Sequence, residues 1–466
     1  MKKIIMLLAL CLLLPAMALA DCPVTVTGEN TADAYSWDET TRTLTIKENG
    51  LTLDENGSSV DYGIVVEKGV TELTIENIQI HAGDRVDLTV KDNLTLTVKE
   101  ELTLSGIDVS GETPPLKTLI AEGCKLTIAG SGTVYMLGKT KGDLTLDSLS
   151  EVRIDGIVEG NVHVTGGSDA YMISGSVEGV ITLSNENAKV SIGSQYKDRA
   201  ALIGGLNVSA GELTIRGGYS YYSRGGYGMR LTTGSIITGG KVTIAGGHSR
   251  EQGGEALIRE NGATLTVSGG SLTLKGGVYQ SQKSSVSPDY TRPSAALSGE
   301  NARALVWKSP MQMRTYQYDG AKDKYKDEAD AFGPQDLAGR HVIQSVAGAW
   351  VVSYDANGGE GAMPGRIVMD KDPYNIIQTC AFTREGYAFD GWEVIVNGQK
   401  MDYMPTITVT ADTTIRALWK ELPNNGGSGA AADNLPKTGD PSCLAGWAAL
   451  LLASAAGAGA MRRRKH

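Results

Sequence analysis

The chain has 466 residues and a formal net charge of −10, so it has room for two or three domains with sizeable cores. An acidic chain is poorly suited to binding nucleic acid, or to adhering to anionic envelope polymers by charge alone. Glycine contributes 59 residues, whereas heptads and long stretches with a helical period are missing. This composition predicts an all-β protein.

The first 20 residues have the order of a secretory signal peptide. A charged start precedes an apolar run over residues 4–14, and small residues end at Ala20. We expect cleavage between Ala20 and Asp21, so that the mature chain is exported. Lipid attachment at Cys22 is the alternative, but Asp21 is a poor residue for the position before such a cysteine.

Three cysteines remain between the predicted terminal segments: Cys22, Cys124 and Cys380. They are widely spaced and match neither a disulfide framework nor a zinc pattern. At most one bridge can form among them, and the sequence does not say which. P-loop, nucleophile-elbow, HExxH and calcium-nonapeptide motifs are also missing. The sequence therefore predicts no metal and no cofactor.

The C-terminal residues contain four segments in a fixed order. A linker rich in Gly and Asn, residues 421–434, precedes the pentapeptide 435–439. The apolar segment 443–461 is long enough to cross the hydrocarbon core as a helix, and the basic tail 462–466 would hold its end in the cytoplasm. We expect the precursor to occupy the membrane only transiently. A permanent single-span anchor is the alternative.

The pentapeptide consists of Leu435, Pro436, Lys437, Thr438 and Gly439. With the segments that follow, it resembles the LPXTG cell-wall sorting signal of Gram-positive surface proteins. The resemblance implies that a sortase thiolate attacks the carbonyl of Thr438, expels Gly439 and passes Thr438 to an amino group of a peptidoglycan precursor. Sortase and peptidoglycan are the implied partners, and the cell wall is the implied location. Without both terminal segments, the formal charge becomes −15.

Residues 21–310 contain recurring triplets of the Leu-Thr-Ile type. The most regular begin at Leu126, Leu144, Val162 and Ile181, at nearly equal intervals along the chain. Short strands at a near-fixed period predict a parallel β-helix or solenoid, with the apolar side chains of each triplet facing a core. About 20 residues per rung predict roughly 14 rungs. A β-sandwich is the alternative, which the brevity of the strands and the lack of Trp between residues 60 and 297 disfavour.

The opening of this region has residues 35–38 and 43–46 as its strand-like elements. It resembles the first module of β-helical surface proteins of Gram-positive gut bacteria, and the array as a whole resembles pectate-lyase-like surface proteins, which implies a right-handed coil. We expect Trp37 to cap the first rung rather than to bind sugar, because the strand edges of an open solenoid end must be covered.

Residues 311–348 are polar and charged, and are expected to form a connecting segment with one short helix. Residues 349–420 then resemble the Listeria-Bacteroides repeat, the internalin-type B repeat, in three blocks: 352–359, 386–392 and 411–419. The resemblance implies a small β-grasp-like domain. Its large aromatic residues are expected to pack in the core. These are Tyr387, Phe389, Trp392 and Trp419.

A glycine-rich stretch, residues 216–230, carries the candidate ligand contacts. These are Tyr219, Tyr221, Tyr222, Arg224 and Tyr227. Tyrosines on such a loop can stack on sugar rings or anchor a protein partner at low entropic cost. The alternative is a solvated insertion between two rungs.

The acidic residues do not form a recognisable catalytic pattern. Asp143, Asp147, Asp155 and Asp169 occupy turn positions, where Asp is favoured for its local backbone hydrogen bonds. His163, in the centre of a triplet, is expected to face outward. The sequence thus favours a non-catalytic adhesin or a protein that binds a glycan or a host surface protein. A wall-anchored polysaccharide lyase or hydrolase and a structural spacer are the alternatives.

Overall fold

The computed structural model describes most of the expected exported chain: residues 22–28, 33–55, 61–81, 83, 85–105, 114–168, 170–194, 199–221, 223–280, 290–319 and 324–423. The predicted signal peptide with its cleavage site, Asp169, Tyr222, nearly all of the linker, the sorting pentapeptide, the apolar segment and the basic tail lie outside these ranges. None of the helices within these ranges combines the length and the apolar character that a membrane span requires.

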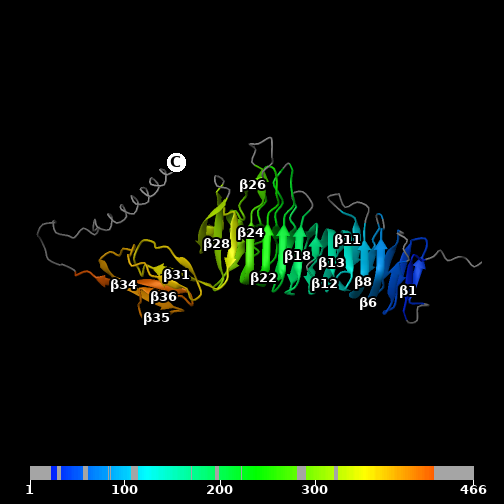
Figure 1. The fold of residues 1–466 in the computed structure, drawn as a ribbon, viewed down its shortest axis with the longest axis horizontal. Coiled ribbons are helices and arrows are strands. Elements are labelled where there is room, and N and C mark those ends of the chain that lie inside the picture. Colours follow the sequence, from blue (N-terminus) through cyan, green and yellow to red (C-terminus); the bar gives the residue numbers. More distant parts are fainter. Residues whose placement is uncertain are drawn as a thin grey trace, which may run out of the picture.

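The protein is an all-β solenoid followed by a smaller β domain, and Figure 1 shows the two in line along one long axis. Each rung contributes up to three strands, and each strand pairs in parallel with its counterpart one rung away. Several long strands bend at a corner and so belong to two rows. The sequence prediction of an all-β solenoid is confirmed.

The first row contains eleven strands within the described ranges, fewer than the rung estimate from sequence because loops and caps consume residues without adding rungs. It is formed by β4 (Thr52–Glu55), β6 (Glu72–Ile80), β8 (Leu94–Leu104), β10 (Lys125–Gly130), β12 (Asp143–Asp147), β14 (Val162–Val164), β17 (Val180–Leu183), β19 (Leu202–Val208), β22 (Ser235–Ala245), β24 (Leu265–Lys275) and β27 (Leu305–Trp307).

The second row follows the first in each rung. It uses the later parts of β6, β8, β22 and β24, together with β11 (Thr133–Lys141), β13 (Glu151–Glu159), β15 (Tyr171–Ile173), β18 (Lys189–Gly193) and β20 (Glu212–Arg216). We call its outer surface the second face.

The third row closes each rung. It uses the later parts of β11 and β13 and the start of β19, together with β3 (Thr43–Ile46), β5 (Gly63–Val66), β7 (Leu88–Val90), β9 (Leu116–Ile120), β16 (Ser176–Val177), β21 (Met229–Leu231) and β23 (Leu257–Arg259).

The triplets recognised in the sequence are stacked in register. Leu126 pairs with Leu144, Leu144 with Val162, and Val162 with Ile181, and all four side chains are fully buried. The interval between successive triplets is therefore the length of one rung. Alternation of side chains along each strand sends the middle residue of the triplet outward and the other two into the core.

The N-terminal end of the solenoid is closed by antiparallel strands. β1 (Val24–Thr27) pairs with β4, and β2 (Tyr35–Asp38) forms a hairpin with β3. Trp37 lies in this hairpin and meets Tyr62 edge-on, with the ring centroids 6.4 Å apart. Trp37 thus belongs to the cap, as expected, and the antiparallel strands cover edges that would otherwise pair with another chain.

Residues 311–348 do not merely connect two domains, as we expected, but complete the solenoid. β30 (Val342–Val346) pairs antiparallel with β24, and β28 (Gln312–Asp319) pairs with β30 and with β29 (Lys324–Ala331). The expected short helix is α1 (Pro334–Leu337). The last rung needs this cap because its strand edges are unpaired, a tertiary requirement that the charged composition of the segment does not reveal. β25 (Val278–Gln280), β26 (Tyr290–Pro293) and the 3-10 helix η1 (Gly299–Ala304) precede the cap.

The C-terminal domain has its own core and a five-stranded mixed sheet. In chain order the strands of the domain are β31 (Ala349–Asp355), β32 (Arg366–Met369), β33 (Pro373–Asn375), β34 (Tyr387–Val396), β35 (Gln399–Met401), β36 (Thr406–Thr408) and β37 (Thr413–Glu421). β33 and β36 pair with each other in a separate two-stranded sheet. The sheet order is β32-β31-β37-β34-β35, with β31 and β37 parallel at its centre. This is the strand order expected of a β-grasp sheet, but the described residues of the domain include no helix to pack on it.

The aromatic residues of this domain pack around one tryptophan. Trp392 is 6% exposed and meets Phe389 with the ring centroids 4.8 Å apart. Phe389 in turn contacts Trp419. Tyr387 differs from the expectation, because its ring lies against Arg384 at the surface, 4.1 Å from centroid to guanidinium carbon.

One fully buried ion pair interrupts the regular packing near the N-terminal end. Lys117 and Asp87 are 2% and 0% exposed, and Nζ lies 3.5 Å from Oδ1. Nζ also donates hydrogen bonds to the carbonyl oxygens of Arg85, at 3.1 Å, and Gly83. Burial raises the pKa of Asp87 to about 7, and the positive charge of Lys117 opposes this rise.

Lys117→Met should destabilise these rungs by about 3–5 kcal/mol at pH 8, because Asp87 is then buried without a counter-ion. Amide hydrogen exchange of β7 and β9 measures this loss. The matched control Lys241→Met removes an exposed pair with Glu212, whose side chains are 62% and 37% exposed, and should cost less than about 1 kcal/mol.

The stability lost in Lys117→Met should become smaller as the pH falls. The folded-state pKa of Asp87 lies above its ordinary value of 3.8, so the native state binds more protons between these two values, and this carboxyl favours folding less as the pH rises through that window. Without Lys117 its pKa is higher still, and protonation at pH 5 relieves most of the buried charge. Equal losses at pH 5 and pH 8 would contradict a buried carboxylate as the cause.

Candidate ligand-binding surface

The rungs of the solenoid lengthen toward its C-terminal end. Successive partners in the first row are Thr182, Asn207, Ile236, Thr266 and Val306, and the interval between partners grows at every step. Much of the added length lies at the corner between the second and third rows. We call residues 217–228, 246–256 and 276–280 the fin. Figure 1 shows loops rising from the green rungs beside β26 in this region.

Glycines build the base of the fin. The amides of Gly226, Gly247, Gly254 and Gly277 donate to the carbonyl oxygens of Gly218, Gly226, Gly247 and Gly254 respectively, at 2.7–2.9 Å. A Cβ on Gly247 would lie 1.9 Å from the oxygen of Gly218, so no larger residue fits here. The stretch predicted as ligand loop or solvated insertion is thus hydrogen-bonded to its neighbours and extends the stack sideways.

The tips of the fin are aligned as well. Ser220 pairs in parallel with Ser249, and Ser249 with Tyr279. The buried Ser249 hydroxyl accepts the amides of Glu251 and Gln252 and so closes a tight turn. This register places Tyr219 beside His248, and Tyr221 beside Arg250.

The predicted ligand contacts divide into two groups. Tyr219 is 41% exposed, and Tyr221 lies beneath Arg250, whose guanidinium carbon is 3.4 Å from the ring centroid. Arg224 instead faces the fin base, where it pairs with Glu255 at 2.7 Å and lies over the ring of Tyr227. Tyr222 lies outside the described residues.

Glu255 explains why Arg224 and Tyr227 belong to the base of the fin. This carboxylate is 5% exposed and accepts hydrogen bonds from the Ser298 amide and hydroxyl and from Asn301 Nδ2, besides Arg224. A buried carboxylate with several donors joins the fin to η1. Substitution of Arg224 would therefore disturb the fin rather than test a ligand contact.

Two fin residues were not predicted from the sequence, namely His248 and Arg250. They belong to the rung that follows the predicted loop, and only the stacking of rungs brings them beside it. The sequence does contain a repeat that aligns the two loops: residues 217–220 and 246–249 share the pattern Gly-Gly-x-Ser. Recognition of that repeat would have aligned the two loops.

Arg216 lies at the end of β20 on the second face, and its positive charge acts on His248 of the fin. His248 Nδ1 accepts the amide of Val278 at 3.2 Å, and burial, followed by the positive charge of Arg216, lowers the pKa of His248. Neither Arg216 nor Arg250 forms an ion pair with a carboxylate in the described part of the chain. The fin and its base therefore expose two arginines, Arg216 and Arg250, together with the carboxylate of Glu251.

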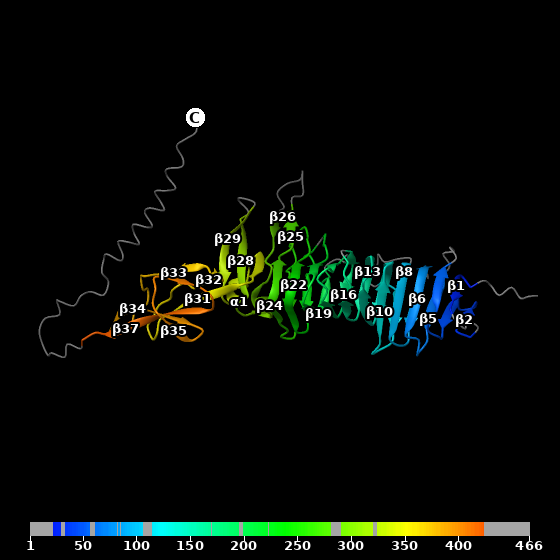
Figure 2. The ribbon, with the colours of Figure 1, turned by 60° about the horizontal axis from the view of Figure 1, so that its bottom comes forward.

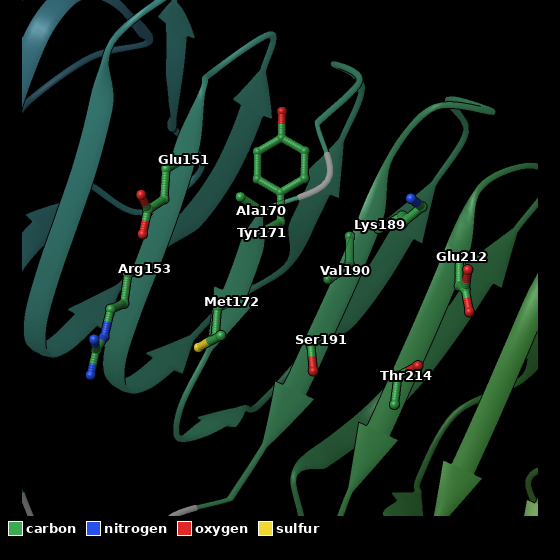
Figure 3. A pocket seen from close by; sticks show the side chains of 10 residues that line it. All are labelled: Glu151, Arg153, Ala170, Tyr171, Met172, Lys189, Val190, Ser191, Glu212 and Thr214. Atoms are coloured by element: carbon green, nitrogen blue, oxygen red, sulfur yellow. The ribbon is translucent and has the colours of Figure 1, made fainter.

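A shallow hollow of about 320 Å³ lies on the second face over β13, β15, β18 and β20. Figure 3 shows side chains from these successive strands around it. Met172, 49% exposed, contributes an apolar surface, while charged side chains surround it. These are Glu151, Arg153, Lys189 and Glu212. The hollow and the base of the fin thus share the outer side of β20, where Thr214 and Arg216 both lie.

The aspartates have local structural partners, but those described do not lie in turns as expected. Asp143 and Asp147 begin and end β12, and Asp155 lies within β13 and is 9% exposed. Asp143 accepts hydrogen bonds from the amide and side chain of Asn161, at 2.8 and 3.1 Å, and Asp155 pairs with Arg153 at 2.9 Å. Asp147 accepts the hydroxyl of Ser148. Asp169 lies outside the described residues.

Other reactive groups are dispersed. Within the described ranges, no three His, Cys, Asp or Glu side chains are grouped so that they could hold a metal ion. Cys22, Cys124 and Cys380 are free and half-buried. His163 is also half-buried and stands between Thr145 and Thr182 in the first row.

Comparison of the chain with protein-family models, with curated proteins and with solved structures gives no match. The resemblances noted for the sorting signal, the opening module and residues 349–420 therefore stay predictions. Function has to be argued from the surfaces described above.

Gly247→Ala should open the fin while leaving the rungs folded, because the new methyl group would collide with the Gly218 carbonyl. A cost of about 1–3 kcal/mol is typical of such overpacking, and it should raise the rate of tryptic cleavage after Arg224 or Arg250 roughly tenfold. Gly234→Ala is the matched control, since a Cβ there meets nothing within 4 Å. Equal cleavage rates in the two variants would mean that the fin does not depend on this contact.

Proposed function

We propose that this chain is a non-catalytic surface protein, covalently anchored to the cell wall by a sortase, that binds an extended glycan or a host surface protein along the fin and the adjoining second face. The observation that carries the ligand-binding part is the stacking of Arg250 from one loop on Tyr221 of the preceding loop. Side chains from successive rungs are thereby held together on one projecting surface.

The fin has the composition of a binding surface. Aromatic rings and arginines supply much of the binding energy at many interfaces, and an aromatic ring beneath a guanidinium presents both apolar area and charge. Hydrogen bonds at the glycine base order the loops before a ligand arrives, which lowers the entropic cost of association. Among the predicted contacts that the structure describes, Tyr219 is the most exposed, at 41%.

The shape of the protein supports projection from a wall. Figure 2 places β37 at the end of the molecule away from the solenoid, so the chain leaves toward the sorting motif from that end. The linker of 14 residues spans at most about 50 Å. The fin lies on the last rungs of the solenoid, so the cap, the C-terminal domain and the linker separate it from the proposed anchor, while the earlier rungs extend beyond it.

Leu435→Ala should leave the protein in the membrane fraction, from which detergent extracts it, because the sortase motif is lost and the uncleaved apolar segment 443–461 still spans the membrane. In the unaltered protein, digestion of the wall with a muramidase should yield a chain that ends at Thr438 and carries a peptidoglycan fragment, as measured by mass spectrometry. Leu422→Ala, outside the motif, is the control and should stay on the wall. Release of the unaltered protein by detergent alone would overturn the anchoring proposal. So would residues beyond Gly439 on the unaltered protein that the muramidase releases.

The fragment 21–438, screened against glycans and host surface proteins, should be retained by a ligand, and the double variant Tyr219→Ala/Tyr221→Ala should bind it at least tenfold more weakly, a loss of about 1.4 kcal/mol or more. Its thermal midpoint should change little, because neither side chain belongs to the hydrophobic core of the solenoid. Tyr325→Ala is the control, an exposed tyrosine of the C-terminal cap, and should bind normally.

The same screen separates the alternatives. New reducing or unsaturated ends in a retained polysaccharide would identify an enzyme. A folded protein that is retained by nothing in the panel would favour a structural spacer. Unchanged affinity of the double variant would remove the fin from the proposal.

A further inference from the structure

The central strands of the C-terminal domain are its first and its last. β31 and β37 are parallel, and their register runs from Val352 opposite Thr413 to Asp355 opposite Arg416. The chain enters β31 from the solenoid and leaves β37 toward the C-terminus. Because the two strands point the same way, the entry of one and the exit of the other lie at opposite ends of the sheet.

The entry end of the domain is tied to the solenoid by more than the chain itself. Asp412 Oδ1 accepts the hydroxyl of Ser309 at 2.7 Å and the amide of Val351 at 2.9 Å. Asp330 of the solenoid cap accepts the amide of Ile367 at 2.8 Å. A pull on the solenoid is thus passed to the start of the sheet.

β37, the strand through which the chain leaves the domain, is paired on both sides. β37 pairs in parallel with β31 and antiparallel with β34, whose register runs from Tyr387 opposite Glu421 to Val396 opposite Thr413. Arg416 Nε lies 2.8 Å from Asp355 Oδ2 and links the two central strands. Val352 and Ile415, on the same pair, are fully buried. Movement of β37 along its axis would break backbone hydrogen bonds and core packing together.

We propose that this domain is a force-bearing clamp, in which tension between the anchored C-terminus and a ligand-bound solenoid loads β31 and β37 in shear. The tension in the cell rests on the proposed wall anchoring, whereas the clamp itself is a property of the strand order. In shear, the hydrogen bonds of the pair share the load and must fail nearly together. In peeling, each bond carries the full load in turn, so rupture needs less force.

Single-molecule pulling on the chain 21–438 tests the clamp. Two tether sites are introduced by Ala347→Cys and Glu421→Cys, in a background with Cys22→Ser, Cys124→Ser and Cys380→Ser. This pair pulls the entry of β31 against the exit of β37. Forced unfolding reports the rate of barrier crossing, so the rupture force at a fixed loading rate is the measure.

The matched geometry uses Ala347→Cys with Met369→Cys in the same background. Ala349 and Met369 face each other at the open end of the antiparallel β31–β32 pair, so this tether peels the edge strand bond by bond. We expect a rupture force several-fold higher for the shear tether. Asp355→Ala should lower the force in the shear geometry and leave the peeling geometry unchanged.

Equal rupture forces in the two geometries would overturn the clamp, whatever the fate of the anchoring proposal. Conversely, release of the native protein by detergent alone would remove the anchored load without altering either rupture force. A thermal midpoint for the cysteine-free background equal to that of the unaltered protein confirms that the comparison is made on the native fold. The two proposals therefore fail on different measurements.

Discussion

Each rung of the solenoid depends on the backbone hydrogen bonds that its strands form with the rungs on either side. A three-residue strand such as β14 is too short to be stable alone, and it persists because β12 and β17 pair with it on both sides. The same pairing stacks Leu144, Val162 and Ile181 into one continuous core. Strand length, side-chain alternation and burial are all consequences of this one repeated contact.

The same constraint explains the departures from the repeat. A stack of paired strands has two open ends, and in this protein each is closed by antiparallel strands, β1 and β2 at the start and β28 to β30 at the finish. A rung can be lengthened at a corner only where the added loop residues also pair with the next rung. The glycine base of the fin meets that condition, because only glycines allow backbones to approach so closely on both sides.

Ordered stacking also links the fold to the proposed function. Residues from different rungs, such as Tyr221 and Arg250, reach one surface because the loops that carry them pair with each other. That surface lies on the last rungs of the solenoid, and the parallel central strands of the last domain lie between it and the C-terminal linker. The proposed ligand surface and the proposed clamp thus follow each other along one axis.

The candidate site was predicted only in part. Tyr219 and Tyr221 lie on the projecting surface, as expected. The sequence could indicate this because a glycine-rich run between two triplets is typical of a loop at a corner of the solenoid. Arg224 and Tyr227 are instead part of the fin base, where Glu255 holds the arginine. Composition and spacing cannot separate these pairs, since the distinction depends on a carboxylate that the next rung supplies.

The sequence by itself determined the all-β class, the length of the central rungs and the start of the final domain at residue 349, because these follow from local alternation, spacing and composition. Tertiary structure alone decided that residues 311–348 are a cap, that Lys117 and Asp87 form a buried pair and that His248 and Arg250 join the fin. Each of these depends on contacts between residues in different rungs or on the need to cover a strand edge. Such contacts arise only when the chain is stacked, so no local pattern reveals them.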